Sequence, residues 1–204
     1  MSDGPPFTVF IVDDEPRVLA ALSRLVTQAG YRSRTFSSAR DFLSDHDPLV
    51  AGCALLDLAM PDLDGLELQR LLSAGHSERP IIFITGRGDI PTTVRAMKAG
   101  AIDFLTKPID DRDLLAAIEH AREAESRALR ARSEIGSITV KLATLTPRER
   151  QVIPYVVAGK LNKQIAIELG TVEKTIKVHR ARMMRKLGIR TVQELVRLAE
   201  RAGI

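Results

Sequence analysis

The chain has 204 residues, of which 45% are hydrophobic, so it is long and apolar enough to form one large core or two modest ones. The formal net charge of +4 conceals an uneven distribution. Residues 1–125 hold 13 basic and 20 acidic side chains, a net charge of −7, whereas residues 126–204 hold 17 basic and 6 acidic ones, a net charge of +11. An acidic part joined to a basic part predicts two domains, and we expect the basic part to bind a polyanion such as nucleic acid.

The cysteine content and the apolar runs exclude two other classes of protein. Cys53 is the single cysteine, so an internal disulfide is excluded and a reducing compartment fits. No apolar run approaches the roughly 18–20 residues that cross a bilayer, and the first residues have neither the basic nor the apolar region of a signal peptide. We therefore expect a cytoplasmic protein with no membrane partner.

Apolar runs alternate with helical patterns through residues 1–125. The expected strands are Phe7–Val12, Arg32–Phe36, Cys53–Asp57, Ile81–Ile84 and Ile102–Leu105. One expected helix starts at Pro16, and the others cover Ala39–Asp45, Leu66–Leu72 and Thr92–Ala99. About five repeats of strand and helix predict an α/β fold, in which helices cover both faces of a doubly wound parallel sheet.

Polar side chains stand where these apolar strands end: Asp13, Asp14, Asp57, Thr85 and Lys107. Each alone has a structural explanation, such as a helix cap or a turn, but capping does not readily explain all of them together at strand ends. The ends of parallel strands meet at one edge of a sheet. Clustered carboxylates repel one another unless a cation neutralises them, and Mg²⁺ suits such oxygen ligands. Phosphoryl transfer to Asp57 would then be stabilised by the ion and by the Lys107 ammonium, and Thr85 could hydrogen-bond the product.

A helical connector is expected over residues 111–135. Its apolar face fades after Arg122, which is typical of a helix that bridges two domains through solvent. Gly136-Ser137 is the predicted break. A coiled-coil dimer is the alternative interpretation, although only Leu115, Ile118, Leu129 and a few alanines could line its seam.

Four short helices separated by glycine turns are expected after residue 140. Thr146 should cap the first, which Pro154 should kink, Asn162 should cap the second, and Thr191 should cap the last. In the third, about 172–187, the residues that can face a core are Ile176, Met183 and Leu187. The opposite stripe holds Lys174, Lys177, Val178, Ala181, Arg182 and Arg185. A short helix, a tight turn and a longer helix with a basic face fit a helix-turn-helix.

Residues 7–122 resemble the receiver domain of bacterial two-component response regulators. The matching residues are Asp13-Asp14, Asp57, Met60-Pro61, Asp64-Gly65, Thr85-Gly86, Gly100-Ala101, Asp103-Phe104 and Lys107-Pro108. The resemblance implies a flavodoxin-like, five-stranded parallel sheet. It also implies that a sensor histidine kinase phosphorylates Asp57.

The same resemblance implies roles for the surrounding residues. Asp14, Asp57 and the main-chain carbonyl of Ala59 would hold Mg²⁺, with Asp13 acting through water. Lys107 would contact the phosphoryl group through a cis Lys107-Pro108 bond. Thr85 and Phe104 would form the switch pair, and Phe104 stands where tyrosine is commoner.

Residues 142–204 resemble LuxR-type DNA-binding domains. The matching residues are Leu145-Thr146, Arg148-Glu149, Gly159, Asn162-Lys163, Ile165-Ala166, Leu169-Gly170, Thr175-Ile176-Lys177, His179 and Lys186-Leu187. With the receiver, and with the stretch from Gly86-x-Gly88-Asp89-Ile90-Pro91 to Gly100, the whole chain resembles a FixJ-type response regulator. The match implies base contacts from Lys177, Val178 and Ala181, and phosphate contacts from Lys163, Lys174, Thr175, Arg182 and Arg185. Thr171-Val172 stands where the family usually has Ile-Ser.

The sequence thus predicts a receiver domain (1–122), a helical linker (123–140) and an all-α, four-helix helix-turn-helix domain (141–204). The expected function is transcription regulation that is switched on by phosphorylation, through dimerisation and promoter binding, with RNA polymerase as a further partner and no enzymatic turnover. One alternative is a Mg²⁺-dependent phosphatase with an aspartyl-phosphate intermediate, but such folds usually place a second Asp where this chain has Ala59. The other is a constitutive DNA binder with a vestigial receiver.

Overall fold

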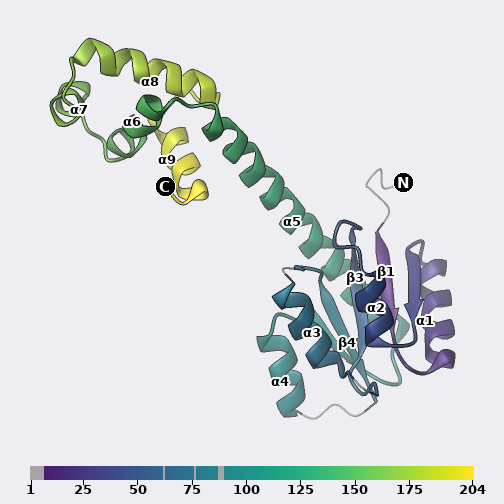
Figure 1. Cartoon of the computed structure of the whole chain (residues 1–204). Helices are drawn as coiled ribbons and strands as arrows, with labels where there is room; N and C mark the ends of the chain where they lie inside the picture. The colour runs from purple at the N-terminus through teal and green to yellow at the C-terminus, as the bar shows by residue number, and fades with distance from the viewer. Residues whose placement is uncertain (1–6, 62, 76, 87–89) are drawn as a thin grey trace. The chain divides into compact units, whose positions relative to one another are not determined.

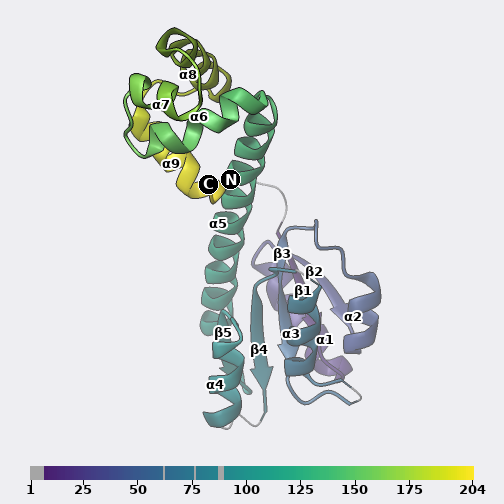
Figure 2. The same ribbon diagram turned by 60° about the vertical axis from the view of Figure 1, so that its left-hand side comes forward.

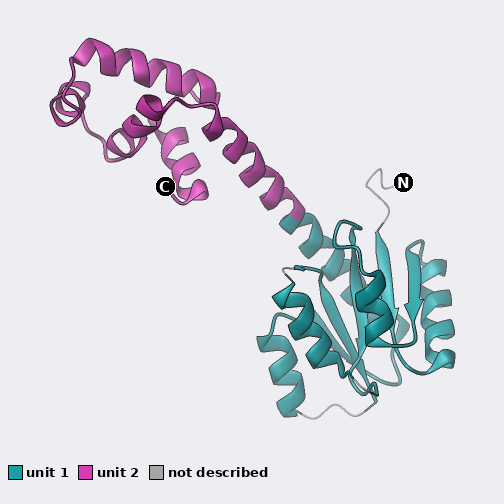
Figure 3. Ribbon diagram, in the orientation of Figure 1, with its two compact units in different colours: residues 1–128 teal, residues 129–204 magenta. Residues whose placement is uncertain are grey.

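The computed structural model describes residues 7–61, 63–75, 77–86 and 90–204. The chain forms two compact units, residues 1–128 and residues 129–204 (Figure 3). The first combines strands with helices and the second is helical (Figure 1). The division lies close to the point at which the net charge of the sequence changes sign.

Unit 1 is built on a parallel sheet, as expected. Within its described residues, the sheet has five strands in the order β2-β1-β3-β4-β5, all paired in parallel. The strands are β1 (Thr8–Val12), β2 (Arg32–Phe36), β3 (Gly52–Asp57), β4 (Ile81–Thr85) and β5 (Asp103–Thr106). The helices are α1 (Pro16–Gln28), α2 (Ala39–Asp45), α3 (Gly65–Ala74), α4 (Ile90–Lys98) and the first part of α5 (Asp111–Ala143). The predicted bounds agree to within one or two residues, the usual disagreement at element ends.

The sheet is covered on both faces (Figures 1 and 2). Alternate residues of each central strand enter one of two separate cores. Phe10, Leu56 and Phe83 belong to the core under α2, α3 and α4. The other core lies under α1 and α5 and takes residues such as Ile11 and Leu55. Because β1, β3 and β4 are buried on both sides, the polar residues at their ends emerge at one edge of the sheet.

The predicted break at Gly136-Ser137 is wrong, because α5 continues to Ala143. A single glycine costs a helix only about 1 kcal/mol, and the neighbouring Ala, Arg and Glu residues favour helix. Beyond the glycine, Ile138 and Leu142 pack into the core of unit 2, which stabilises the last turns. Propensity and packing together therefore outweigh one unfavourable residue.

Unit 2 packs short helices around its own core. They are α6 (Pro147–Val157), α7 (Asn162–Glu168), α8 (Glu173–Leu187) and α9 (Val192–Ala202). Ile176, Met183 and Leu187 are buried, as the helical spacing predicted. The helix α6 runs on through Pro154 to Val157. No helix in the described part of the chain is long and apolar enough to cross a membrane.

Two of the three side-chain caps expected in unit 2 form, at α6 and α9. Thr146 and Glu149 form a reciprocal capping box at α6, and Thr191 caps α9. Asn162, however, is the first residue of α7 and not its cap, which is Leu161. Its side chain accepts a hydrogen bond from Arg180 of α8 instead, at 3.2 Å. The Asn162 side chain therefore bonds to a residue that is distant in the sequence and does not cap its own helix.

Candidate functional site

Lys107 lies at the centre of the polar edge of the sheet. Its Nζ is 2.9 Å from Oδ2 of Asp13, 3.2 Å from Oδ1 of Asp57 and 3.5 Å from Oε1 of Glu15. Asp13 and Asp57 are buried, with 1% and 4% of their surface exposed. The prediction that strand ends bring Asp13, Asp57 and Lys107 together is confirmed. Glu15 was not predicted, although it continues the acidic run Asp13-Asp14.

The main chain fixes both carboxylates. Oδ1 of Asp13 accepts a hydrogen bond from the N–H of Glu15, and Oδ2 of Asp57 accepts one from the N–H of Ala59. The Lys107-Pro108 peptide bond is cis, as expected, and the N–H of Lys107 donates to the carbonyl of Thr85 at 2.7 Å. Lys107 is therefore tied to the end of β4 while its side chain reaches the ends of β1 and β3.

Burial and charge act in opposite directions on these groups. Burial raises the pKa of the Asp57 carboxyl, and the nearby Lys107 ammonium only partly offsets this effect. For Lys107, burial opposes the charged form, but hydrogen bonds to Asp13 and Asp57 outweigh it and raise the pKa of the ammonium. The ammonium therefore stays protonated. A positive charge that approaches Asp57 would stabilise the ionised form of its carboxyl group.

The expected cluster of three carboxylates is corrected in one respect. Asp14 is exposed, whereas Asp13 and Asp57 point to the shared ammonium. In residues 7–61, 63–75, 77–86 and 90–204, no group of three or more His, Cys, Asp or Glu side chains gathers closely enough to hold a metal ion. An acidic run on a turn points its side chains in different directions, which spacing along the chain does not reveal. The donors available at this edge are nevertheless all oxygens, which suits a hard cation.

The two expected switch residues lie on neighbouring strands. Thr85 ends β4 and is buried, and it pairs in register with Thr106. Phe104 pairs with Phe83, and their ring centroids are 6.5 Å apart. Phe104 is half-buried against the core under α3 and α4. The pair therefore joins the edge that holds Asp57 to one helical face of unit 1.

The expected DNA-binding residues gather on α7 and α8. On α8, the residues opposite the buried face are exposed: Lys174, Lys177, Val178, Ala181, Arg182 and Arg185. Lys163 of α7 is also exposed, and Thr175 is half-buried. Lys177 lies 3.1 Å from Glu173, one turn earlier on the helix. The helix therefore presents one basic stripe that can enter a groove of DNA.

The turn before α8 departs from a capped helix start. Gly170 has a φ of 62°, a conformation that glycine adopts without strain. The N-cap of α8 is Val172, whose side chain has no oxygen with which to cap the first turn. No side chain at the cap position therefore accepts from that turn, and the N–H of Thr175 donates to the main-chain carbonyl of Val172 at 3.0 Å.

A partly buried ion pair holds α8 against the start of α6. Nζ of Lys186 is 2.6 Å from Oε2 of Glu149 and also donates to the carbonyl of Thr144 at 3.0 Å. Lys186, helped by the N–H of Thr146, lowers the pKa of the Glu149 carboxyl to about 2. The spacing of Glu149 from Thr146 indicates a capping box, but nothing in the sequence indicates its ion pair with Lys186.

This ion pair predicts a pH dependence. A depressed folded-state pKa means that the pair contributes its full stability above 4.5, the ordinary value, and loses it as the pH falls through about 2. In Lys186→Met, the buried carboxylate lacks its partner, so the variant should unfold more readily than the native chain at neutral pH. Chemical unfolding across the acid range should show this difference shrinking as the pH falls. If the difference in unfolding free energy did not change with pH, the destabilisation of Lys186→Met would be due to lost packing.

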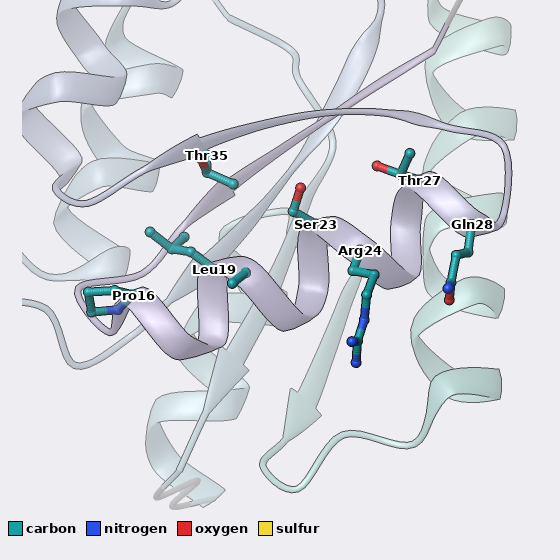
Figure 4. Close-up of a pocket in the computed structure, with 8 residues that line it drawn as sticks. Pro16, Leu19, Ser23, Arg24, Thr27, Gln28 and Thr35 are labelled. Carbon is teal, nitrogen blue, oxygen red and sulfur yellow. The ribbon is translucent and has the colours of Figure 1, made fainter.

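Pocket size by itself does not identify the site. A pocket of about 750 Å³ lies beside α1 and is lined by residues such as Leu19, Ser23 and Thr27, with Thr35 of β2 (Figure 4). It holds none of the expected site residues. A smaller pocket of about 370 Å³ lies between α1 and the start of α5 and is lined by Lys107 together with Val18, Ala21, Leu25, Ile109 and Leu114. An apolar groove thus lies beside the polar edge of the sheet.

Comparison with known proteins agrees with both units. Residues 9–119 match the response regulator receiver domain, and residues 143–199 match the bacterial regulatory proteins of the luxR family. The chain is 47% identical to the response regulator protein TmoT of Ectopseudomonas mendocina, over 95% of this chain and 88% of that protein. It is 41% identical to the transcriptional regulatory protein FixJ of Bradyrhizobium diazoefficiens, over 96% of each chain. The solved structure of the response regulator StyR superimposes with a TM-score of 0.84 at 45% identity, covering 97% of this chain and 99% of that one.

Proposed function

The chain belongs to the two-component transcription regulators that join a receiver domain to a LuxR-family DNA-binding domain, and we propose that phosphorylation of Asp57 controls its binding to promoter DNA. The observation that carries this proposal is the contact of Lys107 with both Asp13 and Asp57 at one edge of the sheet. We keep the limits 1–122, 123–140 and 141–204 as our division into receiver, linker and DNA-binding domain.

The proposed reaction is the transfer of a phosphoryl group from a phosphohistidine of the sensor kinase. A carboxylate oxygen of Asp57 attacks phosphorus, the bond from phosphorus to the imidazole nitrogen breaks, and the imidazole leaves with the electron pair. Negative charge builds up on the phosphoryl oxygens, and the ammonium of Lys107, 3.2 Å from Asp57, is placed to stabilise it. Thr85, at the end of the neighbouring strand, can hydrogen-bond the phosphorylated product.

We propose magnesium as the cofactor of this site. The residues that would hold it are Asp14, Asp57 and the carbonyl of Ala59, with Asp13 acting through water. When bound, the ion neutralises charge on the phosphoryl oxygens, which a lysine alone cannot fully offset. The oxygen donors support this assignment, while the exposure of Asp14 means that its side chain has to turn toward the site.

The proposed switch connects Asp57 to the face of α4. Phosphorylation adds roughly −1.5 to −2 charges at the edge of the sheet. Thr85 can move toward the phosphoryl oxygens. Phe104, half-buried beside Phe83, can then fill the space that Thr85 leaves. A full reversal of the population, from 1:99 to 99:1, would need a bias of about 5.5 kcal/mol.

Dimerisation upon phosphorylation is part of the proposal. An exposed apolar stripe on α4 supports it: Ile90, Val94 and Met97 follow at helical spacing and have 81%, 43% and 43% of their surface exposed. A dimer presents two basic stripes to paired half-sites, which raises affinity for a promoter. Bound there, the regulator would act on RNA polymerase.

The apolar groove between α1 and α5 supports a kinase as the phosphodonor. It lies beside Lys107 and fits an apolar helix of a partner. Ala21→Arg should place a long charged side chain in this groove and slow phosphotransfer from the kinase by about tenfold or more, equivalent to about 1.4 kcal/mol of docking free energy. Phosphorylation by a small-molecule donor should continue at the native rate, which a radiolabel transfer assay would measure.

Ala20→Arg is the matched control for this prediction. Ala20 and Ala21 are adjacent and exposed on α1, but Ala20 lines the pocket on the other side of the helix. The control should accept phosphate from both donors normally. Equal losses in the two variants would contradict docking in the groove.

The proposed function is tested by DNA binding. Fluorescence anisotropy against a pool of promoter fragments would be measured with and without a small-molecule phosphodonor plus Mg²⁺, over a range of salt concentrations. We expect the donor to tighten binding and to shift the protein from monomer to dimer. Equal binding with and without the donor would favour a constitutive DNA binder, whereas sustained turnover of a phosphate ester would favour a phosphatase.

A further inference from the structure

A small pocket in unit 2 lies beside the basic stripe of α8. Its volume is about 160 Å³, and its lining includes Arg148 of α6, Thr171 of the turn before α8, and Thr175 and His179 of α8. Liquid water takes about 30 Å³ per molecule, so the space is larger than one water needs. The pocket therefore has room for a polyatomic group.

The chemistry of the lining favours an anion. Arg148 supplies a guanidinium, which also donates to Oε1 of Gln151 at 3.0 Å, and Thr171 and Thr175 supply hydroxyl groups. Nδ1 of His179 is buried and has no hydrogen-bond partner in the described chain. The described residues that line the pocket include none with a carboxylate. A buried polar nitrogen without a partner calls for an explanation, and a bound oxyanion with hydroxyl and guanidinium donors around it is one.

The position of the pocket points to DNA as the source of that anion. Thr175, His179 and Arg182 follow one another at spacings of four and three residues, so they form one row along α8, beside the row of Lys174, Val178 and Ala181. The row begins at the first turn of α8, where Val172 offers no side-chain cap. The positive end of a 15-residue helix also favours a phosphate at this point.

We propose that this pocket, formed by Arg148, Thr171, Thr175 and His179, binds one backbone phosphate of the DNA strand that runs beside α8. The inference rests on the proposed DNA-binding function and extends it. It brings α6 into the DNA interface and gives Arg148, Thr171 and His179 a contact that the resemblance did not imply. A phosphate contact fixes the register of α8 on the duplex without reading its sequence.

The test compares two arginines of α6. Arg148 lines the pocket, whereas Arg150 does not, and its guanidinium donates to the carbonyl of Leu142 at 2.8 Å. Binding of the full chain to a promoter fragment and to an unrelated duplex would be measured by anisotropy at several KCl concentrations, with and without phosphodonor. In Arg148→Ala, the slope of log affinity against log salt should become shallower by about one, on both duplexes. In Arg150→Ala, the slope should stay native.

Thr175→Val provides a second variant that preserves shape. It removes a neutral donor, so it should weaken DNA binding by about fivefold while leaving the salt slope unchanged, because no counterion exchange is lost.

A native slope in Arg148→Ala, or an equal change in Arg150→Ala, would overturn the inference. If the native chain still responds to phosphodonor in that case, the proposed function stands and the pocket alone is ruled out. A chain that binds neither duplex overturns both.

Inorganic phosphate separates a DNA phosphate from a free one. Without DNA, and at constant ionic strength, added phosphate should raise the unfolding temperature of the native chain but not that of Arg148→Ala. This stabilisation, together with a shallower salt slope in Arg148→Ala, supports the pocket as a DNA phosphate site. Stabilisation with an unchanged slope would assign the pocket to a free oxyanion and overturn the proposal.

Discussion

Asp57→Asn is expected to abolish the gain in DNA affinity that a phosphodonor gives the native chain. An amide at this position cannot act as the nucleophile, so no acyl phosphate forms. The fold should persist, because burial disfavours the Asp57 carboxylate and Lys107 keeps its contact with Asp13 at 2.9 Å. Anisotropy with donor and Mg²⁺ measures the first effect, and chemical unfolding measures the second.

Asp14→Asn is the matched control for this experiment. Asp14 is next to Asp13 but exposed, and its proposed role is to hold Mg²⁺. The variant should still be phosphorylated on Asp57, at a higher concentration of Mg²⁺ than the native chain needs. Phosphorylation of Asp57→Asn at the native level would place the acceptor elsewhere, on Asp13 or Asp14.

Gly65→Ala is expected to destabilise unit 1 and to slow phosphorylation at the same time. A Cβ at this position would lie 2.5 Å from the carbonyl oxygen of Asp57, and also close to Phe83 and Leu58. The contact is with main chain, so relief requires a shift of the end of β3, which carries the acceptor. Overpacking of this kind costs about 1–3 kcal/mol. Chemical unfolding and the rate of phosphorylation by a small-molecule donor would measure the two effects.

Gly75→Ala is the control at the other end of the same helix. Its added Cβ would meet main-chain oxygens of Leu71 and Leu72 at 3.4 and 3.5 Å, ordinary contact distances, and its φ of −78° suits alanine. The variant should be as stable as the native chain or slightly more stable, and it should be phosphorylated normally. A similar loss in both variants would show that α3 tolerates no added methyl group, and that the approach to Asp57 is not the cause.

The sequence was sufficient for the architecture and for the centre of the site. Apolar runs that end in Asp13, Asp57 and Lys107 force these residues to the surface where the strands stop, and parallel pairing brings the ends together. The same reasoning held for α8, because the spacing of Ile176, Met183 and Leu187 fixes which face is buried. Periodicity determines both results, since burial of apolar side chains dominates the folding energy.

Only the tertiary structure decided the partners of individual polar groups. Asn162 was expected to cap its helix, but its side chain accepts a hydrogen bond from Arg180 of another helix. Glu149 forms the capping box that its spacing indicates, and it also pairs with Lys186. Gly136 looked like a helix end, but packing of the following turn kept α5 continuous. Each of these results depends on residues far apart in the chain. Hydrogen bonds and ion pairs act over a few ångströms and depend on direction. The hydrophobic pattern of the sequence indicates only on which face of an element a side chain lies.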